Sequence, residues 1–382
     1  MKYVICVPDG CADLPVPELG GLTPLEVADT PHMDALAARA VVGRAAVIPE
    51  GMAPSSDVGN MSILGFDPAA FHTGRAPIEA AAMGLTLRPD QVAFRCNLVT
   101  VVDGVMVDYA GGTPSDEVAA EVINRIDAEL GGGRDGVSFH PGISFRHSMI
   151  APADWVDADC VPPHDLTGDP VVPSGGPAGP RLNDLMDASR DILASSDLEA
   201  TQIWLWGQGF QLQIPSFAET HGVRVGLVTA VDLVRGIGML SGMKVCDIPG
   251  ATGLYDTDYE GKRDVALAEL AGGLDLFVIH VEATDYAGHA GDVAEKVRAL
   301  ENWDSRIIAD LIPGLDAMGP WRLLMLPDHG TPLTTRTHTA DPVPYMLVDS
   351  RTDGPGGVFT EAGVTGEPPV TGHGLLPTLL AG

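Results

Sequence analysis

Residues 274–285 read LDLFVIHVEATD, a largely apolar run that stops at a polar tip. A short apolar run that ends at a turn is typical of a strand buried on both faces of a sheet. The pattern recurs at residues 3–7 (YVICV), 201–206 (TQIWLW), 223–228 (VRVGLV) and 322–326 (RLLML). Helical stretches such as 264–270 and 294–311 lie between these runs. The alternation predicts a doubly wound, mainly parallel α/β sheet, which binds ligands at the carboxyl ends of its strands.

The middle of the chain has a different pattern. Residues 94–102 and 105–109 flank Asp103-Gly104, which predicts a hairpin. We also expect a helix over 117–130, strands within 137–150 and a flexible Pro/Gly loop at 172–180. The sequence therefore predicts a smaller α+β domain inserted into the α/β domain. The expected limits are 86–196 for the insertion and 1–85 with 197–382 for the α/β domain.

The charge balance limits the partners of the chain. Its 382 residues include 22 Lys and Arg against 52 Asp and Glu, a formal net charge of −30, and 45% of them are hydrophobic, enough for a large core. Nucleic acids and anionic membranes attract proteins with a basic surface. Because this chain is strongly acidic, we do not expect non-specific binding to either. A small phosphorylated substrate remains compatible, because a few local cations can form a positive pocket within a negative field.

Cysteine usage and hydropathy indicate the compartment. The five cysteines are odd in number, widely spaced and without a CxxC pair, which is typical of reduced cytosolic thiols. The N-terminal run MKYVICVPDG is too short for a signal peptide, and no apolar stretch approaches the roughly 20 residues that span a bilayer. We expect a cytoplasmic protein without membrane contact.

Aspartate and histidine recur at the expected strand ends. Asp285 and His289 are four residues apart, so on a helical turn they share one face and can bind one ion. Asp328 and His329 are adjacent, and at a strand end such side chains should diverge and reach two different ions. Two further members of the set are Asp9 and His338. Any one of these residues alone is more often a polar cap, but the six together favour a metal site suited to Mn²⁺ or Zn²⁺.

A serine precedes an apolar helix in the stretch Pro54-Ser55-Ser56-Asp57. Ser55 or Ser56 is expected to cap this helix, with Gly65 at its far end. The helix N-terminus offers free N–H groups and a positive dipole end, which stabilise a bound phosphate. Alone the motif indicates a plain cap, whereas beside a two-metal site it indicates a nucleophile.

Cations are scarce in this acidic chain, so each is a candidate for anion binding. Arginine forks bind phosphate and carboxylate bidentately, although a surface ion pair is the common alternative. The candidates are Arg75, Arg95, Arg146 and Lys262, with His164 and Asp165 as weaker polar signals. Neither GxGxxG after the first strand nor GxxxxGK[ST] occurs, which argues against a dinucleotide site or a P-loop kinase.

Motifs along almost the whole chain resemble the cofactor-independent phosphoglycerate mutases of the archaeal type, within the alkaline phosphatase superfamily. They include VPDGCAD (7–13), PSSDVGNMSILGFDP (54–68), HTGRAPIEAA (72–81), PGATGLYDTDYEGK (249–262), VEATDYAGHAGD (281–292) and LPDHGTPLTTRTHTADPVP (326–344). The resemblance implies a phosphatase-like domain with two divalent ions, Mn²⁺ first and Zn²⁺, Co²⁺ or Mg²⁺ as alternatives, and an inserted domain that closes over the substrate. The implied reaction interconverts 3-phosphoglycerate and 2-phosphoglycerate through a phosphoserine.

The resemblance also implies roles for individual residues. Ser56 would be the nucleophile, and Lys262 would neutralise the transferred phosphoryl group. One ion would be held by Asp285, His289 and His338, and the other by Asp9, Ser56, Asp328 and His329. Candidates for holding the glycerate carboxylate and hydroxyls are Arg95, Arg146, His164 and Asp165.

The chain departs from the family pattern in two places. Ser55 stands where the family usually has glycine, and the stretch 191–200 before IWLWGQG is shorter than expected. Two alternatives therefore stay open: a related phosphotransferase of the homoserine-kinase type, or a metal-dependent phosphatase. Both would use the same serine and two-metal core.

Overall fold

The computed structural model describes residues 1–381 and divides into two compact units. The first unit consists of residues 1–71 and 214–382, and the second of residues 72–213. The domain limits expected at 86 and 196 therefore fall inside the second unit. No helix within residues 1–381 is long and apolar enough to cross a membrane.

The first unit is built on an eight-stranded, mainly parallel sheet with the order β13-β2-β12-β11-β1-β10-β8-β9, which confirms the predicted fold class. Strand β1 (Lys2–Pro8) lies between β10 (Leu276–Val281) and β11 (Trp321–Met325) and is parallel to both. Beyond β10, the sheet continues in parallel with β8 (Val225–Val228) and β9 (Lys244–Cys246). Beyond β11, β12 (Val343–Asp349) is antiparallel to both β11 and β2 (Val41–Ala46), and β13 (Val370–Thr371) completes the edge.

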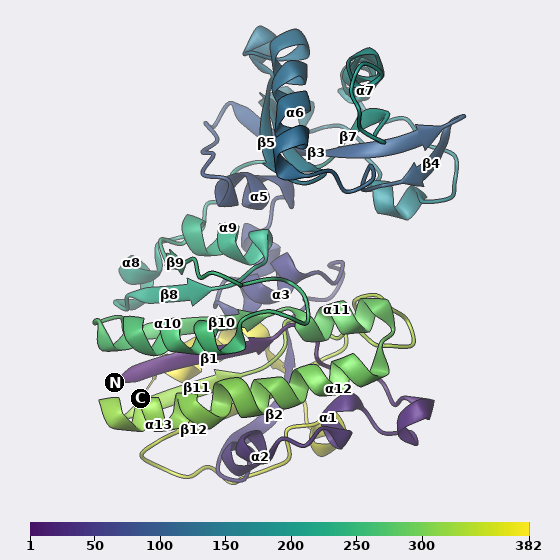
Figure 1. Ribbon diagram of the computed structural model, residues 1–382. Helices are drawn as coiled ribbons and strands as arrows, with labels where there is room; N and C mark the ends of the chain where they lie inside the picture. Colours follow the sequence, from purple (N-terminus) through teal and green to yellow (C-terminus); the bar gives the residue numbers. More distant parts are fainter. Residues whose placement is uncertain (382) are drawn as a thin grey trace. The chain divides into compact units, whose positions relative to one another are not determined.

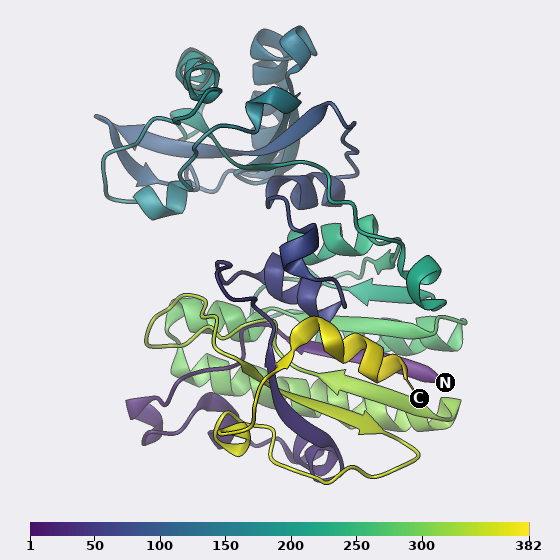
Figure 2. The same cartoon turned by 180° about the vertical axis from the view of Figure 1, so that it is seen from behind.

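Helices lie on both faces of this sheet. Figure 1 shows α10, α12 and α13 on one face, and Figure 2 shows α14 on the other. The α-helices are α1 (Pro24–Val27), α2 (Pro31–Ala37), α3 (Ser56–Ile63), α4 (Pro68–Phe71), α8 (Phe217–His221), α9 (Asp232–Leu240), α10 (Tyr259–Ala271), α11 (Ala283–Ala290), α12 (Val293–Asn302), α13 (Ala309–Met318) and α14 (Leu375–Leu380). A π-helical turn, η5 (Trp303–Ile308), joins α12 to α13, and short 3-10 turns are η1 (Pro17–Leu19), η6 (Ala362–Val364) and η7 (Gly372–Gly374).

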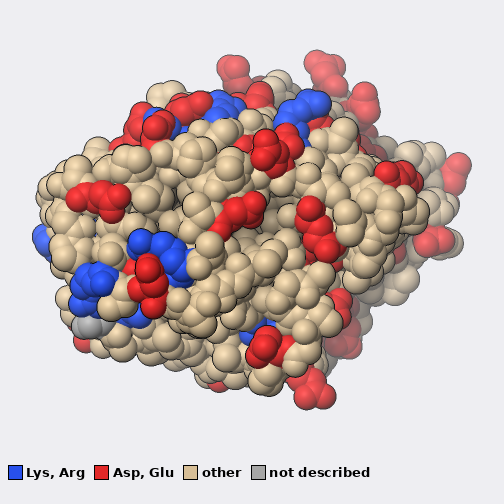
Figure 3. Space-filling model, turned by 90° about the horizontal axis from the view of Figure 1, so that it is seen from below, with Lys and Arg blue, Asp and Glu red and all other residues tan. Residues whose placement is uncertain are grey.

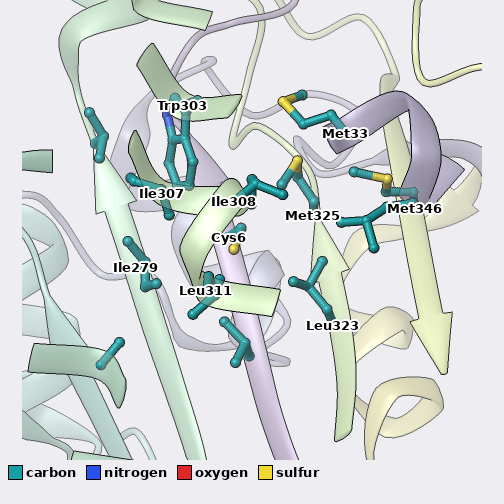
Figure 4. Close-up of a cluster of buried hydrophobic side chains, with 14 of the residues drawn as sticks. Cys6, Met33, Ile279, Trp303, Ile307, Ile308, Leu311, Leu323, Met325 and Met346 are labelled. Atoms are coloured by element: carbon teal, nitrogen blue, oxygen red, sulfur yellow. The ribbon is translucent and has the colours of Figure 1, made fainter. Parts of the chain in front are cut away.

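The main core lies between the central strands and the rod, the continuous helical segment that α12, η5 and α13 form. Side chains of Cys6, Ile279 and Met325 on the strands meet Trp303 and Leu311 on the rod (Figure 4). These side chains are almost fully buried, and each contributes roughly 1.5–3 kcal/mol when removed from water. The packing fixes β1, β10 and β11 side by side, which brings their carboxyl ends together.

The second unit contains a five-stranded sheet centred on the long strand β3 (Gln91–Val102). The hairpin is confirmed: Asp103 and Gly104 both have positive φ, as a two-residue turn requires, and β4 (Val105–Asp108) returns along β3. Strands β5 (Ser138–Ile143) and β6 (Arg146–Pro152) extend the sheet. The helices are α5 (Ala76–Ala82), α6 (Asp116–Leu130) and α7 (Gly179–Leu193), with 3-10 turns η2 (Arg134–Gly136), η3 (Ala153–Trp155) and η4 (Pro163–Leu166).

One strand belongs to a different sheet from the one expected. Residues 201–206 were expected in the parallel sheet, but β7 (Gln202–Gly209) pairs antiparallel with β3 in the second unit, so that prediction is wrong. Its apolar run is buried because it packs with α7 and the other side chains of the second core. The length and composition of an apolar run indicate a buried strand, but they do not indicate its partner.

The charged side chains on one face of the molecule are mostly acidic (Figure 3), in line with the composition. Figure 3 shows Asp and Glu scattered over one face, with Lys and Arg confined to a few places.

Candidate active site

The carboxyl ends of three adjacent parallel strands carry most of the predicted metal ligands. Asp9 follows β1 directly, Asp285 lies on α11 just after β10, and Asp328 and His329 lie in the loop after β11. Gly10 has a φ of 61°, and a Cβ at that position would collide with Asp285 and Thr331. Only glycine therefore lets the first loop pass so close to the other two.

Asp9 is a buried acid at the centre of the candidate ligands. It is 1% exposed, and neither of its carboxylate oxygens accepts a hydrogen bond from residues 1–381. The nearest ring nitrogens are Nε2 of His280 at 3.4 Å and Nε2 of His329 at 3.6 Å. Burial, together with the neighbouring carboxylates Asp328, Asp285 and Glu282, raises the pKa of Asp9 well above its ordinary value. A buried carboxylate whose nearest ring nitrogens lie 3.4 Å or more away fits a cation ligand, because a cation would offset its desolvation.

Three groups of side chains have ligand atoms close enough to share an ion, and two of them combine carboxylates with histidine. In each group, all the ligand atoms lie within 4.8 Å of one another. The first group is Asp9, Asp328 and His329, and the second is Asp285, His329 and His338. Carboxylate and imidazole ligands together suit first-row transition metals such as Mn²⁺ and Zn²⁺.

His329 belongs to both groups, which changes the expected division of the ligands. Its Nε2 lies only 3.5 Å from Oδ2 of Asp328, so the expectation that these two side chains diverge is wrong. Strand β11 ends at Met325, and the two residues lie beyond it in a bend where the alternation of a strand no longer holds.

His289 lies at the outer side of the second group. Its Nε2 is 2.9 Å from Nε2 of His338 and 3.3 Å from Oδ2 of Asp285. The side chain of Asp285 also accepts a hydrogen bond from the hydroxyl of Thr331. The structure thus brings together all six Asp and His residues that the strand-end pattern singled out.

Ser56 is the first residue of α3, and Ser55 occupies the N-cap position without a capping side-chain hydrogen bond. The Oγ of Ser56 lies 3.1 Å from Nε2 of His329, so the hydroxyl faces the candidate metal ligands. Gly59, one turn further on, contacts the Asp328 backbone so closely that a Cβ would lie 2.0 Å from the Asp328 carbonyl oxygen. This close approach sets the position of the serine helix against the ligand loop.

Lys262 enters the site from α10 and is fully buried. Its Nζ donates to the carbonyl oxygen of His280 at 2.9 Å. Burial lowers the pKa of Lys262 to about 8, against the opposing effect of the Glu282 and Asp9 carboxylates. An amine in this environment is a compact cation close to Asp9.

Sequence reasoning did not single out His280, Glu282 or Asn60. His280 is a histidine inside the apolar run 274–281, fully buried in β10, and burial lowers its pKa to about 4. Its Nδ1 lies 3.3 Å from Oγ1 of Thr229. Glu282 forms a third acidic group with Asp9 and Asp285. The signal for His280 and Glu282 was available, because each is a polar residue within or directly after a buried strand.

The candidate substrate residues lie in the second unit, along one row of rings. Arg95 is buried, pairs through Nε with Glu79 at 2.7 Å and stacks on Trp206 at 4.3 Å. His164 lies 5.3 Å from the Trp206 ring, with Asp165 beside it at 3.6 Å. The row continues from His164 through Tyr109 and Phe145 to the exposed Arg146. Arg75 also pairs with Glu79, at 3.2 Å.

The fold and the site together define a class: an α/β enzyme in which a serine at a helix N-terminus faces two groups of potential metal ligands. Comparison with known proteins identifies the family within this class. A family model described as 2,3-bisphosphoglycerate-independent phosphoglycerate mutase matches residues 37–199. The chain belongs to this family of isomerases, because a member of the family is 45% identical to it over 92% of its length.

Two relatives and two solved structures illustrate the likeness. A 2,3-bisphosphoglycerate-independent phosphoglycerate mutase of Methanothrix thermoacetophila is 45% identical, covering 92% of this chain and 91% of the relative. A probable enzyme of the same description from Geobacter sulfurreducens is 42% identical, covering 94% and 93%. A protein of Pyrococcus horikoshii is 27% identical with a TM-score of 0.81, covering 99% of this chain and 96% of the other. A cofactor-independent phosphoglycerate mutase of Thermoplasma acidophilum, 23% identical with a TM-score of 0.64 over 100% of both chains, shares the fold.

Proposed function

We propose that this chain interconverts 3-phosphoglycerate and 2-phosphoglycerate through a phosphoserine at Ser56. The observation that carries the proposal is the position of the Ser56 hydroxyl, 3.1 Å from His329 within a cluster of buried carboxylates and imidazoles. A nucleophile beside such a cluster is the minimum that phosphoryl transfer through the protein requires. Membership of the mutase family supports the choice of substrate.

The proposed division of the metal ligands places His329 with the first ion and adds His289 to the second. Asp9, Asp328, His329 and the hydroxyl of Ser56 would hold one ion, and Asp285, His289 and His338 would hold the other. The donor set of carboxylates and imidazoles favours Mn²⁺, with Zn²⁺, Co²⁺ or Mg²⁺ as alternatives. When bound, two such ions polarise a phosphoryl group and stabilise the attacking and leaving oxygens.

Ser56 attacks the phosphorus of 3-phosphoglycerate, and the bond from phosphorus to the oxygen on carbon 3 breaks. The glycerate stays bound, reorients and attacks the phosphoserine through its 2-hydroxyl, which restores Ser56. Ser56 is the first residue of α3, so the free N–H groups of this helix start would serve as the anion site in both steps. Both transfers thus use one serine and one anion site.

Lys262 supplies a fixed positive charge for the phosphoryl oxygens. Its ammonium is held by the carbonyl of His280, next to Asp9, so it needs no reorganisation when charge develops. The second unit supplies Arg95, Arg146, His164 and Asp165 for the carboxylate and hydroxyls of glycerate. Hydrolysis of the phosphoserine would make the enzyme a phosphatase, so the mutase reaction requires that water be kept from it.

The test is conversion of 3-phosphoglycerate to 2-phosphoglycerate without added 2,3-bisphosphoglycerate. Purified protein is assayed with Mn²⁺ and again after chelation, while inorganic phosphate is measured in parallel. We expect conversion that depends on the metal, with little phosphate release.

The other outcomes separate the alternatives. Release of phosphate from p-nitrophenyl phosphate and from phosphoglycerate, without isomerisation, would assign a phosphatase. Phosphorylation of Ser56 by other esters, with no isomerisation, would assign a phosphotransferase with a different acceptor such as homoserine. Full conversion by a Ser56→Ala variant would contradict the phosphoserine route.

A further inference from the structure

Lys296 is a fully buried cation that the proposed reaction does not use. The sequence contains only four lysines, Lys2, Lys244, Lys262 and Lys296, and the last two have no exposed surface. Lys296 lies in the second turn of α12, on the side of the helix that faces the loops of the site. Burial of a lysine is costly unless its charge is paired and its donors are satisfied.

The ammonium of Lys296 reaches three acceptors on two loops. It donates to Oδ2 of Asp13 at 2.7 Å and to the carbonyl oxygen of Ala12, more weakly, at 3.5 Å. It also donates to the carbonyl oxygen of Thr331 at 2.8 Å. Ala12 and Asp13 belong to the loop that begins at Asp9, whereas Thr331 follows His329 by two residues. An ammonium has three donors, and each of them is directed at one of these acceptors.

Thr331 connects this contact to the candidate metal ligands. Its hydroxyl donates to Oδ1 of Asp285 and lies 3.2 Å from Nδ1 of His329. Its backbone N–H approaches the carbonyls of Gly10 and Ala12 at 3.3 and 3.2 Å. A displacement of the Thr331 backbone would therefore move contacts of both metal-ligand groups at once.

The Asp13 carboxylate also connects the loop after Asp9 to the loop after His329. Besides Lys296, it accepts hydrogen bonds from the backbone N–H of Leu333 at 3.2 Å and of Leu14 at 2.8 Å. Asp13 thus touches the Asp9 loop and the His329 loop in its own right. The side chains of Lys296 and Asp13 are both completely buried, so water does not compete for these bonds.

Stability alone is a poor reason for this arrangement. A buried ion pair commonly contributes no more than apolar side chains of similar volume. Groups that hold metal ligands in place, by contrast, influence metal affinity strongly although they never touch the metal. The contacts of Lys296 end on the two loops that carry the ligands, which favours the second role.

We infer that Lys296 is a positioning residue, which sets the spacing of the Asp9 and His329 loops and thereby the metal affinity of the site. This inference rests on the proposed function, because it requires the two groups to bind metal. In this inference, the charge of Lys296 holds the candidate metal ligands in position and does not contact the substrate.

The test compares the Mn²⁺ affinity of the metal-free wild-type protein with that of three variants. The first variant is the double change Lys296→Met with Asp13→Asn, which removes both charges and keeps side-chain length. The matched control is Arg322→Met. Arg322 is also a buried cation that donates to three carbonyls, those of Thr378, Leu379 and Ala381, but it contacts no loop of the site.

Mn²⁺ dissociation constants are measured by chelator competition, and melting temperatures are measured without metal. We expect the double variant to bind Mn²⁺ at least about 10-fold more weakly than the wild type. The Arg322→Met control should lose thermal stability yet keep its Mn²⁺ affinity. To guard against loss of the fold, Lys296→Arg is measured alongside, since its planar head keeps the charge but not the three-way contact.

The outcomes are distinguishable. Unchanged Mn²⁺ affinity in the folded Lys296 variants, with only a lower melting temperature, would overturn the inference and leave Lys296 a structural residue. An equal loss of affinity in Arg322→Met would also overturn it. A wild-type protein that binds no Mn²⁺ would instead refute the proposed metal centre itself.

Discussion

Nδ2 of Asn60 donates a hydrogen bond to Oδ2 of Asp328 at 2.6 Å, and both side chains are buried. The same Nδ2 donates to the carbonyl oxygen of Ser56, one turn earlier in α3, at 2.9 Å. A single amide group therefore joins the helix that carries the candidate nucleophile to the loop that carries a candidate metal ligand. We therefore expect the distance between the candidate nucleophile Ser56 and the candidate ligand Asp328 to depend on this amide.

Replacing Asn60 with alanine should impair the reaction more than it impairs folding. The change leaves a buried oxygen of Asp328 without its donor, which costs about 1–3 kcal/mol of folding stability. Turnover should fall because Ser56 is no longer held against His329. Ser62→Ala on the same helix is the control, since the buried Ser62 hydroxyl has no hydrogen-bond partner within residues 1–381. Steady-state kinetics and thermal unfolding measure the two effects, and equal losses in both variants would contradict the role of Asn60.

Ser56→Ala should abolish formation of the phosphoenzyme. The alanine removes the only hydroxyl that faces His329 from α3, while the helix and its N–H groups remain. Ser55→Gly is the matched control, because it restores the residue usual in the family one position earlier and should keep full phosphorylation. Intact-protein mass spectrometry after incubation with 3-phosphoglycerate detects the added phosphoryl group. Equal labelling of both variants would place the nucleophile elsewhere.

Metal removal should lower stability as well as activity. Without cations, the buried carboxylates of Asp9, Asp285 and Asp328 repel one another. A ligand at 100 times its dissociation constant stabilises the folded state by about 2.7 kcal/mol. We therefore expect the melting temperature to fall on chelation and to recover with Mn²⁺. The recovery should be smaller in Asp9→Asn, which lacks a ligand of one ion, and should be complete in Asp154→Asn, which changes an exposed aspartate of the second unit. An Asp9→Asn protein that recovers fully would exclude Asp9 as a ligand.

The second unit should lose stability in mild acid because of His147. This buried histidine accepts a hydrogen bond from the N–H of Gly142 at its Nδ1, and burial lowers its pKa to about 3. Between pH 6.5 and 3 the unfolded chain binds a proton at this residue and the folded chain does not, so stability falls as pH falls through this range. The slope is at most about 1.4 kcal/mol per pH unit. The variant His147→Asn keeps a hydrogen-bond acceptor near the position of Nδ1. In this variant the unfolding free energy should depend less on pH. An unchanged pH dependence would contradict the assignment to His147.

Arg95→Lys should weaken substrate binding. The planar guanidinium pairs with Glu79 and stacks on Trp206, and a lysine reproduces neither geometry. We expect KM for 3-phosphoglycerate to rise about 10-fold, as the loss of a hydrogen bond to a charged group implies. Arg88→Lys, at an exposed pair with Asp90, is the control and should leave KM unchanged. A KM unchanged in both variants would remove Arg95 from the substrate site.

The polar residues that follow the central strands could be predicted from the sequence, because the pattern that indicates them is local. An apolar run such as 274–281 is buried as a strand, and the polar residues that follow it lie at the edge of the sheet. Because β1, β10 and β11 are parallel, their tips meet at one edge. Asp9, Asp285 and Asp328 therefore came together as expected, and the family motifs pointed to the same residues.

The tertiary structure alone decided which strands pair and which buried polar groups support the site. The apolar run 202–209 has the pattern of a parallel strand but pairs antiparallel with β3, because side-chain packing selects the partner. His280, Asn60 and Lys296 look in the sequence like isolated polar residues in apolar or helical stretches. Their roles come from acceptors that are up to 284 positions away in the chain, as between Lys296 and Ala12. A local pattern records which residues are buried, whereas contacts of this range exist only after the chain has folded.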